Sequence, residues 1–496
     1  MSGGSGSGAV GSTHAFERVA GVWNARNLRY AVAHGLGRDP RAYGRDLDVV
    51  VHRADSTEAL RVAARVLSDA GFRIARPPRL WGDRIVAIRP EAPYRMLELH
   101  LLRGLAWRNV RLASTPRPSA SRGPFAIDPW ISVAKRVLHP ALAGEWSRFD
   151  ARPEELELSG AERDALLEGL TRLAGRSRAE AFFMAVESGD PRAIVAAARR
   201  AGRVMMLREA ARSPVASVVG MGRAVGRRIG PAFRPCAPIV AVVGPDGAGK
   251  STAIDHLSRT EGWVFTRVER RHWRPGVLPD LSAFTPGSIR ARRFRVEPPA
   301  GAAGSRAGSP ASGDDGGGPR PPRRRSGRLG RVRLAYYCAD AWLGGWLRDR
   351  PAAGHQRLVL YDRCLLDMAV DPARYGLRDG AAVERWWTSL PRPDRVVLLA
   401  GSPDRIVERK PELTVPEVRR QIGEWRRLLA AGLVHDVVEA DRPEREVAAA
   451  LRRIVVEALL ERNPPPPDLI ASTPVSGRGA SPPAATAGTE RERCAS

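Results

Sequence analysis

The pattern of apolar and polar residues divides the 496-residue chain into three kinds of region. Residues 15–115 mix alternating and helical spacing, which predicts a small α+β domain. Residues 129–232 carry apolar side chains at helical spacing, as in 154–173 and 191–211, with no convincing strand. From 237 to 462 short apolar runs alternate with helical stretches, the pattern of an α/β domain with a parallel sheet. The expected fold class is therefore α/β, with a helical middle region and a small N-terminal α+β domain.

Three segments of low complexity separate or flank these regions, and we expect all three to be disordered. They are residues 1–14, rich in Gly and Ser, residues 298–328, and residues 463–496, rich in Pro, Ser and Ala. The middle segment has too few large apolar residues to offset the entropy cost of ordering it. Its Arg323-Arg324-Arg325 run suits a basic arm, but a flexible insertion without a task is favoured.

The charge balance invites a nucleic-acid partner, but the residue usage argues against it. The net charge is +26 with 80 basic residues, of which only Lys135, Lys250 and Lys410 are lysines. Arginine is spread along the whole chain together with abundant Ala, Gly and Pro, which is typical of GC-rich codon usage rather than of a basic patch. Nucleic acid is therefore an unlikely principal partner. The few lysines become informative, because this chain uses arginine wherever any cation suffices.

The chain has no uninterrupted apolar run long enough to cross a membrane, and its first residues lack the order of a signal peptide. Its four cysteines are far apart and form no Cys-x-x-Cys pair. Neither a zinc site nor a disulfide framework is indicated, so we expect a cytoplasmic protein. The sequence leaves the oligomeric state open, with a homodimer as one candidate.

The strongest motif lies at the start of the C-terminal region. A β-branched run, Ile239–Val243, leads into Gly-Pro-Asp-Gly-Ala-Gly-Lys-Ser-Thr and then into a helical stretch. This matches the P-loop pattern in its strand–loop–helix context, where backbone N–H groups and the helix N-terminus cradle phosphates. Lys250 is expected to reach the β- and γ-phosphates of ATP, and Ser251 to ligate Mg²⁺. The expected cofactor-binding residues are Gly244, Asp246, Gly247, Ala248, Gly249, Lys250, Ser251 and Thr252.

Two later segments complete the expected site. A second strand ends in Asp362-Arg363, where a carboxylate can support the metal and an arginine can hold phosphate. A surface ion pair is the alternative. A third strand is followed by Arg405, Arg409 and Lys410, which suit a lid that neutralises charge on the transferring phosphate. A solvated helix face is the alternative there.

Together these motifs resemble the thymidylate kinase family over residues 237–462. The resemblance implies that Asp246 contacts the sugar of the acceptor and that Asp362 and Arg363 position acceptor phosphate and metal-bound water. It also implies that Arg405 and Arg409 stabilise the transferring phosphoryl group.

The chain departs from that family at two places. The Ser-x-x-Ala-Tyr-Gln stretch that holds thymine is absent after Arg363, and Arg-His-Trp-Arg-Pro-Gly at 271–276 replaces the usual Arg-Glu-Pro-Gly. The altered set looks more like a divergent bacterial branch often associated with surface-polysaccharide biosynthesis. The acceptor therefore stays open between a nucleoside monophosphate such as dTMP and a sugar phosphate.

A second candidate site lies near the N-terminus. Asp46 and Asp48 in Gly-Arg-Asp-Leu-Asp share one face of an expected strand, and Glu98 and His100 share the polar face of another. If these strands pair, Asp46, Asp48 and Glu98 converge as a two-metal site requires. The arrangement resembles the minimal nucleotidyltransferase fold, although His-Gly-Leu-Gly at 34–37 lacks the serine of that family's Gly-Ser turn. A folded domain with merely acidic, solvent-facing strand residues is the alternative.

The sequence thus predicts an ATP- and Mg²⁺-dependent phosphotransferase acting on a small-molecule phosphate acceptor. Its expected catalytic residues are Lys250, Asp362, Arg363, Arg409 and Lys410. Two other classes stay open: a nucleotide-binding regulatory or scaffold protein with weak turnover, and a nucleic-acid binder. Whether the N-terminal domain is catalytic is also left open.

Overall fold

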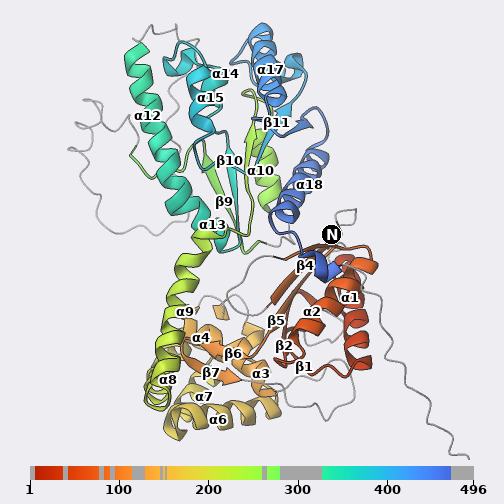
Figure 1. The fold of residues 1–496 in the computed structure, drawn as a ribbon, viewed down its shortest axis with the longest axis vertical. Helices are drawn as coiled ribbons and strands as arrows, with labels where there is room; N and C mark the ends of the chain where they lie inside the picture. The colour runs from red at the N-terminus through yellow and green to blue at the C-terminus, as the bar shows by residue number, and fades with distance from the viewer. Residues whose placement is uncertain are drawn as a thin grey trace, which may run out of the picture.

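The fold was analysed in a computed structural model of the chain. The structure describes residues 6–36, 43–76, 83–89, 95–113, 129–145, 149–150, 153–259, 265–279 and 327–470. Figure 1 shows an N-terminal unit beside a helical region, with the C-terminal unit above both. The expected insertion at 298–328 falls outside the described residues except for its last two positions, which begin a helix.

The N-terminal unit is a mixed five-stranded sheet in the order β1-β2-β5-β4-β3, with β2 and β5 parallel and the other neighbours antiparallel. Its elements are α1 (Gly6–Ala25), β1 (Tyr30–Leu36), β2 (Tyr43–Val51), α2 (Ser56–Asp69), β3 (Arg73–Ala75), β4 (Asp83–Arg89) and β5 (Arg95–Leu102). Leu47, Val49 and Leu99 pack with α1 and α2 in one core. Helix α1 begins at Gly6, earlier than the domain start expected at residue 15.

The helical region contains α3 (Pro129–Val133), η1 (Ala134–Leu138), α4 (His139–Ala143), η2 (Pro153–Leu156), α6 (Gly160–Ala174), α7 (Arg176–Ser188), α8 (Pro191–Arg212) and α9 (Pro214–Phe233). The stretch expected as one helix over 154–173 is split, because Ser159 caps α6 through a reciprocal bond with Glu162. The hairpin of β6 (Leu105–Trp107) and β7 (Val110–Ala113) packs into this helical core. This core also includes Ala31, Ala33 and Val50 of the N-terminal sheet, so the hairpin lies where the two regions share a core.

The C-terminal unit is built on a five-stranded sheet in the order β12-β11-β8-β10-β9, and every neighbouring pair is parallel. Its strands are β8 (Ile239–Val243), β9 (Arg267–His272), β10 (Arg357–Asp362), β11 (Arg395–Ala400) and β12 (Asp436–Glu439). The central strands β8, β10 and β11 are almost wholly buried, as expected for apolar strands covered on both faces. This confirms the predicted α/β unit with a parallel sheet.

Helices cover both faces of this sheet. They are α10 (Lys250–Arg259), α12 (Gly327–Gly344), η4 (Gly345–Asp349), α13 (Arg350–Gly354), α14 (Asp367–Val370), η5 (Ala373–Tyr375), α15 (Ala381–Trp387), α16 (Pro403–Arg409), α17 (Val415–Ala430) and α18 (Glu444–Arg462). Helices α10 and α18 pack against each other, and α12 lies across the sheet from them (Figure 1). Among the described residues, no helix is both long and apolar enough to cross a bilayer.

Part of the segment expected as a tail from residue 463 joins the two sheet units. The Asn463 side chain is buried and donates to the carbonyl of Cys236, 2.8 Å away, and the backbone carbonyl of Asn463 accepts from the Arg76 amide. The short helix α19 (Pro467–Ile470) follows, and Leu469 is buried in the core formed by α1, α2 and the first sheet. The chain therefore returns to its N-terminal unit after the C-terminal one is complete.

We expect Leu469→Ala to loosen the N-terminal unit. Removing a buried leucine side chain costs about 2 kcal/mol or more, equivalent to about thirtyfold faster opening. Hydrogen exchange followed by mass spectrometry should show this in the peptides of α2, which contacts α19. Val437→Ala, at an exposed position of β12, is the control and should leave those peptides unchanged. Equal exchange in both variants would show that α19 does not stabilise this unit.

Candidate functional site

The loop that joins β8 to α10, residues 244–249, is held between two other elements of the C-terminal unit. A side chain at Gly244 would place its Cβ 2.4 Å from the carbonyl oxygen of Leu399 on β11. One at Gly247 would meet the carbonyl oxygen of Ile406 on α16 at 2.9 Å. Both glycines also have positive φ angles, of 141° and 89°. Only glycine satisfies both constraints, so this tight loop depends on its glycines.

Lys250 begins α10 and its side chain is buried inside the curve of the loop. Its Nζ donates to the carbonyls of Gly244 and Pro245 at 2.9 and 2.6 Å. Burial lowers the pKa of this ammonium group, and the nearby carboxylates of Asp367 and Asp362 oppose that shift. A cation held this way gains stabilisation when an anion enters the loop.

Ser251 and Asp362 meet where β8 and β10 end. The Ser251 hydroxyl donates to Asp362 Oδ2 at 2.7 Å, and the same oxygen lies 2.8 Å from an Arg270 nitrogen contributed by β9. The carboxylate is buried, so Arg270 balances a charge that water does not solvate. A hydroxyl and a carboxylate side by side are the hard oxygen donors that Mg²⁺ prefers, and these two residues fit such an ion.

Asp246 within the loop is fixed by arginines. The Arg363 guanidinium pairs with it directly, and Arg374 lies 3.5 Å from its other oxygen. Arg363 also contacts Asp367 at 3.3 Å. Burial raises the pKa of the Asp367 carboxyl, although Arg363 opposes the shift. The structure thus joins Asp246 and Arg363 in a direct ion pair.

The three cations expected in a lid lie on and just after α16, but they point to different partners. Arg405 and Arg409 each donate to backbone carbonyls, those of Asp441 and Ala440, at 3.4 Å. Lys410 stands closest to the loop, since a Cβ at Gly247 would lie 3.1 Å from Lys410 Cβ. Its ammonium group pairs with Glu412 at 3.0 Å. In this conformation none of the three contacts Asp246, Ser251 or Asp362 among the described contacts.

Sequence reasoning missed Arg270, Asp367 and Arg374 as members of this site. Arg270 lies in an Arg-Arg pair whose strand has little apolar character, and Asp367 and Arg374 lie in the segment that departs from the family pattern. Their grouping arises from strand order, because β10 lies between β8 and β9 and all three strands run parallel. In the sequence, the only signal for this grouping was that both segments contain acidic and basic residues.

A cluster of aromatic residues borders the site. The Trp273 ring stacks on Tyr375 with centroids 5.6 Å apart and meets the edge of Tyr337 at 4.6 Å. Trp273 has a positive φ of 64°, and its amide donates to the carbonyl of Asp362. Its indole Nε1 is buried, and no described group accepts a hydrogen bond from it. Strained residues of this kind concentrate at functional sites.

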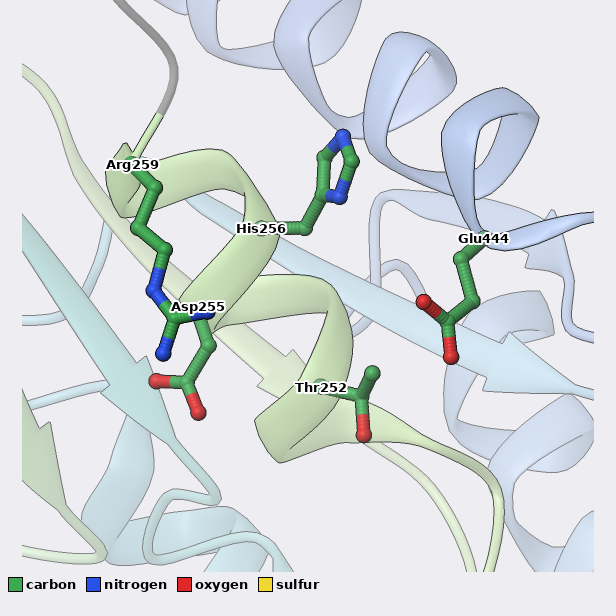
Figure 2. A pocket seen from close by; sticks show the side chains of 5 residues that line it. All are labelled: Thr252, Asp255, His256, Arg259 and Glu444. Carbon is green, nitrogen blue, oxygen red and sulfur yellow. The ribbon is translucent and has the colours of Figure 1, made fainter.

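A pocket of about 390 Å³ adjoins the loop on the flank of α10. In Figure 2, Thr252, Asp255, His256 and Arg259 come from one side of α10, and Glu444 comes from the first turn of α18. The lining carries both signs of charge. Because Thr252 follows Ser251 directly, a ligand whose phosphates lie in the loop has room for its remaining part here.

The two strands of the second candidate site lie side by side. β2 and β5 are parallel neighbours, with Asp46 opposite Glu98 and Asp48 opposite His100. The side chain of Asp46 lies outside the described residues. Asp48, Glu98 and His100 are buried, so the alternative of solvent-facing acidic residues is wrong. The helical region and the C-terminal unit cover this face of the sheet.

These buried groups form a cluster of alternating charge, which we call the junction cluster: Asp48, Arg84, Glu98, His100, Lys135 and Gln356. His100 lies between the carboxylates, with its Nδ1 3.1 Å from Asp48 and its Nε2 against Glu98. Lys135 from η1 reaches Asp48 at 3.1 Å, and Arg84 pairs with Glu98. Gln356 of the C-terminal unit donates to both oxygens of Glu98 at 3.3 Å.

The junction cluster therefore links all three regions of the protein. Within the parts of the chain that the structure describes, no group of three His, Cys, Asp or Glu side chains is arranged to hold a metal ion. The Asp48 and Glu98 carboxylates are instead paired with positively charged side chains of the protein itself. The expectation of a two-metal site stays a prediction, because it also depends on Asp46.

Comparison of the sequence with models of known protein families and with curated proteins gave no match. The function must therefore be inferred from the residues of the site.

We expect Glu98→Gln to destabilise the protein by about 3 kcal/mol, because it leaves the buried Arg84 without its counter-charge. Thermal or urea unfolding should show the loss. Glu180→Gln removes one partner of an exposed pair with Arg176 and should change stability by less than about 0.5 kcal/mol. Equal stability of the two variants would mean that the junction cluster contributes no more than a surface ion pair.

Proposed function

We propose that this protein is an ATP-dependent phosphotransferase. It transfers the γ-phosphoryl group of ATP to a nucleoside monophosphate or a sugar phosphate, as its resemblance to thymidylate kinases suggests. The observation that carries the proposal is the meeting of three groups at the ends of β8 and β10: the buried Lys250, the Ser251 hydroxyl and the Asp362 carboxylate. Such groups at the carboxyl ends of central parallel strands are suited to phosphate and metal binding.

Strand order supports this location. The chain leaves β8 for the far edge at β9, returns to β10 on one side of β8, and then crosses to β11 on the other side. The connections on the two sides of β8 run in opposite directions, which leaves a crevice above its carboxyl end. The 244–249 loop and the N-terminus of α10 occupy that position, so the loop amides and the helix dipole favour an anion there.

Each residue then has a defined task. Lys250 balances charge on the terminal phosphates, and Ser251 and Asp362 would hold the Mg²⁺ that neutralises phosphate oxygens. Arg270, paired with Asp362, keeps that carboxylate oriented. Arg363 and Asp246 would orient the acceptor, with Trp273 and Tyr375 bordering it. Lys410 and Arg409 would approach the transferring group when α16 closes. Because the reaction depends on positioning and electrostatics, no covalent nucleophile is required.

Lys250→Ala should lower phosphoryl transfer by about a thousandfold, because it removes the buried cation that the phosphates require. The assay incubates labelled ATP and Mg²⁺ with a panel of nucleoside monophosphates and sugar phosphates and separates the products. Arg176→Ala, at an exposed position of α7, is the control and should retain full activity. ATP binding without transfer to any acceptor would favour the regulatory class, and no binding of ATP at all would end the proposal.

Lys410→Ala tests the lid separately. We expect kcat to fall about tenfold to a hundredfold while the KM for ATP changes little, because this cation acts on charge that develops during transfer. Arg426→Ala, on the exposed side of α17, should change neither constant. A rise in KM alone would instead assign Lys410 to ground-state binding of the nucleotide.

A further inference from the structure

One side of helix α9 contacts the β6–β7 hairpin. Its Ser217 hydroxyl accepts a bond of 2.9 Å from the side-chain amide of Asn109, in the β6–β7 hairpin. A Cβ at Gly220 would lie 2.8 Å from the Asn109 Cα, so the two backbones are nearly in contact. Towards its end α9 packs on α13. These contacts set the rotation of the helix, which runs along one flank of the molecule between the lower and upper units (Figure 1).

The side of α9 turned away from that hairpin is apolar and exposed. Val215, Val218 and Val225 follow helical spacing, and they are 79%, 73% and 52% exposed. Exposed apolar residues continue beyond them on α8 and along α9: Leu207, Val219, Met221 and Phe233. A helix of 20 residues is about 30 Å long, so this stripe extends along much of one flank. Solvent-exposed stripes of this size usually mark an interaction surface.

The same segment carries only positive charge. No acidic residue occurs between Glu209 and Asp246, whereas this stretch contains Arg212, Arg223, Arg227, Arg228 and Arg234. Arg212 precedes the first residue of α9 by two positions and Arg234 follows its last, and both are exposed. Asp and Glu are also absent from residues 99–127 and 316–339, but 210–245 is the longest acid-free stretch of the chain, and it coincides with the apolar stripe.

The combination of exposed valines and nearby arginines indicates which kind of partner fits the exposed side of α9. A second copy of the chain placed symmetrically on this stripe would bring two arginine-rich helices together at a cost in repulsion. A nucleic acid would pair with the arginines but would leave the valines in water, because its backbone has no apolar surface. The surface of an anionic bilayer accepts both, since apolar side chains enter between acyl chains and arginines meet acidic headgroups.

We propose that α9 is an in-plane membrane-binding helix, which docks this protein on a bilayer containing anionic lipid. Val215, Val218 and Val225 enter the interface, and the flanking arginines contact headgroup phosphates. The helix lies along the membrane and does not cross it. The residues of the stripe are distinct from those of the candidate site at the end of β8.

Flotation of the purified full-length protein with lipid vesicles tests the proposal. The protein should float with phosphatidylcholine vesicles that contain phosphatidylglycerol, and much less with phosphatidylcholine alone. The triple variant V215S/V218S/V225S should lower the bound fraction at least about tenfold, because it removes the inserted apolar groups. The charge variant R212E/R234E should also lower the bound fraction, and the loss should be larger at low salt than at high salt. The matched control V332S/V437S, at exposed sites elsewhere, should bind as the wild type does.

All of these substitutions lie at exposed positions, and circular dichroism and phosphotransferase assays should confirm that each variant folds. Three results would overturn the proposal. The first is the absence of flotation with anionic vesicles, or flotation that the triple valine variant leaves unchanged. The second is a dimer in light scattering that the triple variant dissociates, which would assign the stripe to a second copy. The third is retention on nucleic acid, without flotation, that depends on the arginines and not on the valines.

Discussion

The position of β8 between β10 and β11 is the constraint on which the rest of the candidate site depends. At its carboxyl end the backbone must turn beneath the Leu399 carbonyl, where no side chain fits. Glycine alone permits that turn. Helix α10 begins directly after the loop, at Lys250. The same parallel pairing brings Asp362 to the Ser251 hydroxyl. A buried cation, a hydroxyl and a carboxylate are therefore gathered by strand pairing and not by local sequence.

The two sheet units handle buried charge in different ways. Above β8, Lys250 is bonded mainly to backbone carbonyls, so an entering anion can replace or supplement those bonds. In the junction cluster the carboxylates of Asp48 and Glu98 already have side-chain partners, Arg84 from the same sheet and Lys135 and Gln356 from other regions. Buried ion pairs of this kind add little net stability when complete and are costly to break. The first arrangement suits a site that binds ligands, and the second suits a contact that fixes how the units are joined.

Patterns of short range were predictable from the sequence. The strands β8, β10 and β11 are continuous apolar runs because parallel strands are covered on both faces. The bounds of β8 and the end of β10 at Asp362 were expected from the sequence. Alternation also predicted the polar faces of β2 and β5, whereas their pairing was seen only in the structure. The limits of the units were less predictable. The β6–β7 hairpin belongs to the helical core, and Leu469 belongs to the N-terminal core, because packing across the chain overrides sequence proximity.

The sequence by itself determined the glycine-rich loop, the lysine and serine that end it, and the alternation of strands and helices around it, because these depend on neighbouring residues. Tertiary structure decided which distant charges meet. Arg270 reaches Asp362, Arg374 reaches Asp246, and Lys135 reaches Asp48 across separations that no local pattern encodes. It also decided which side of α9 is left exposed, since that depends on the contact of Gly220 with Asn109. Local spacing fixes which face of an element is apolar, whereas only packing fixes what that face meets.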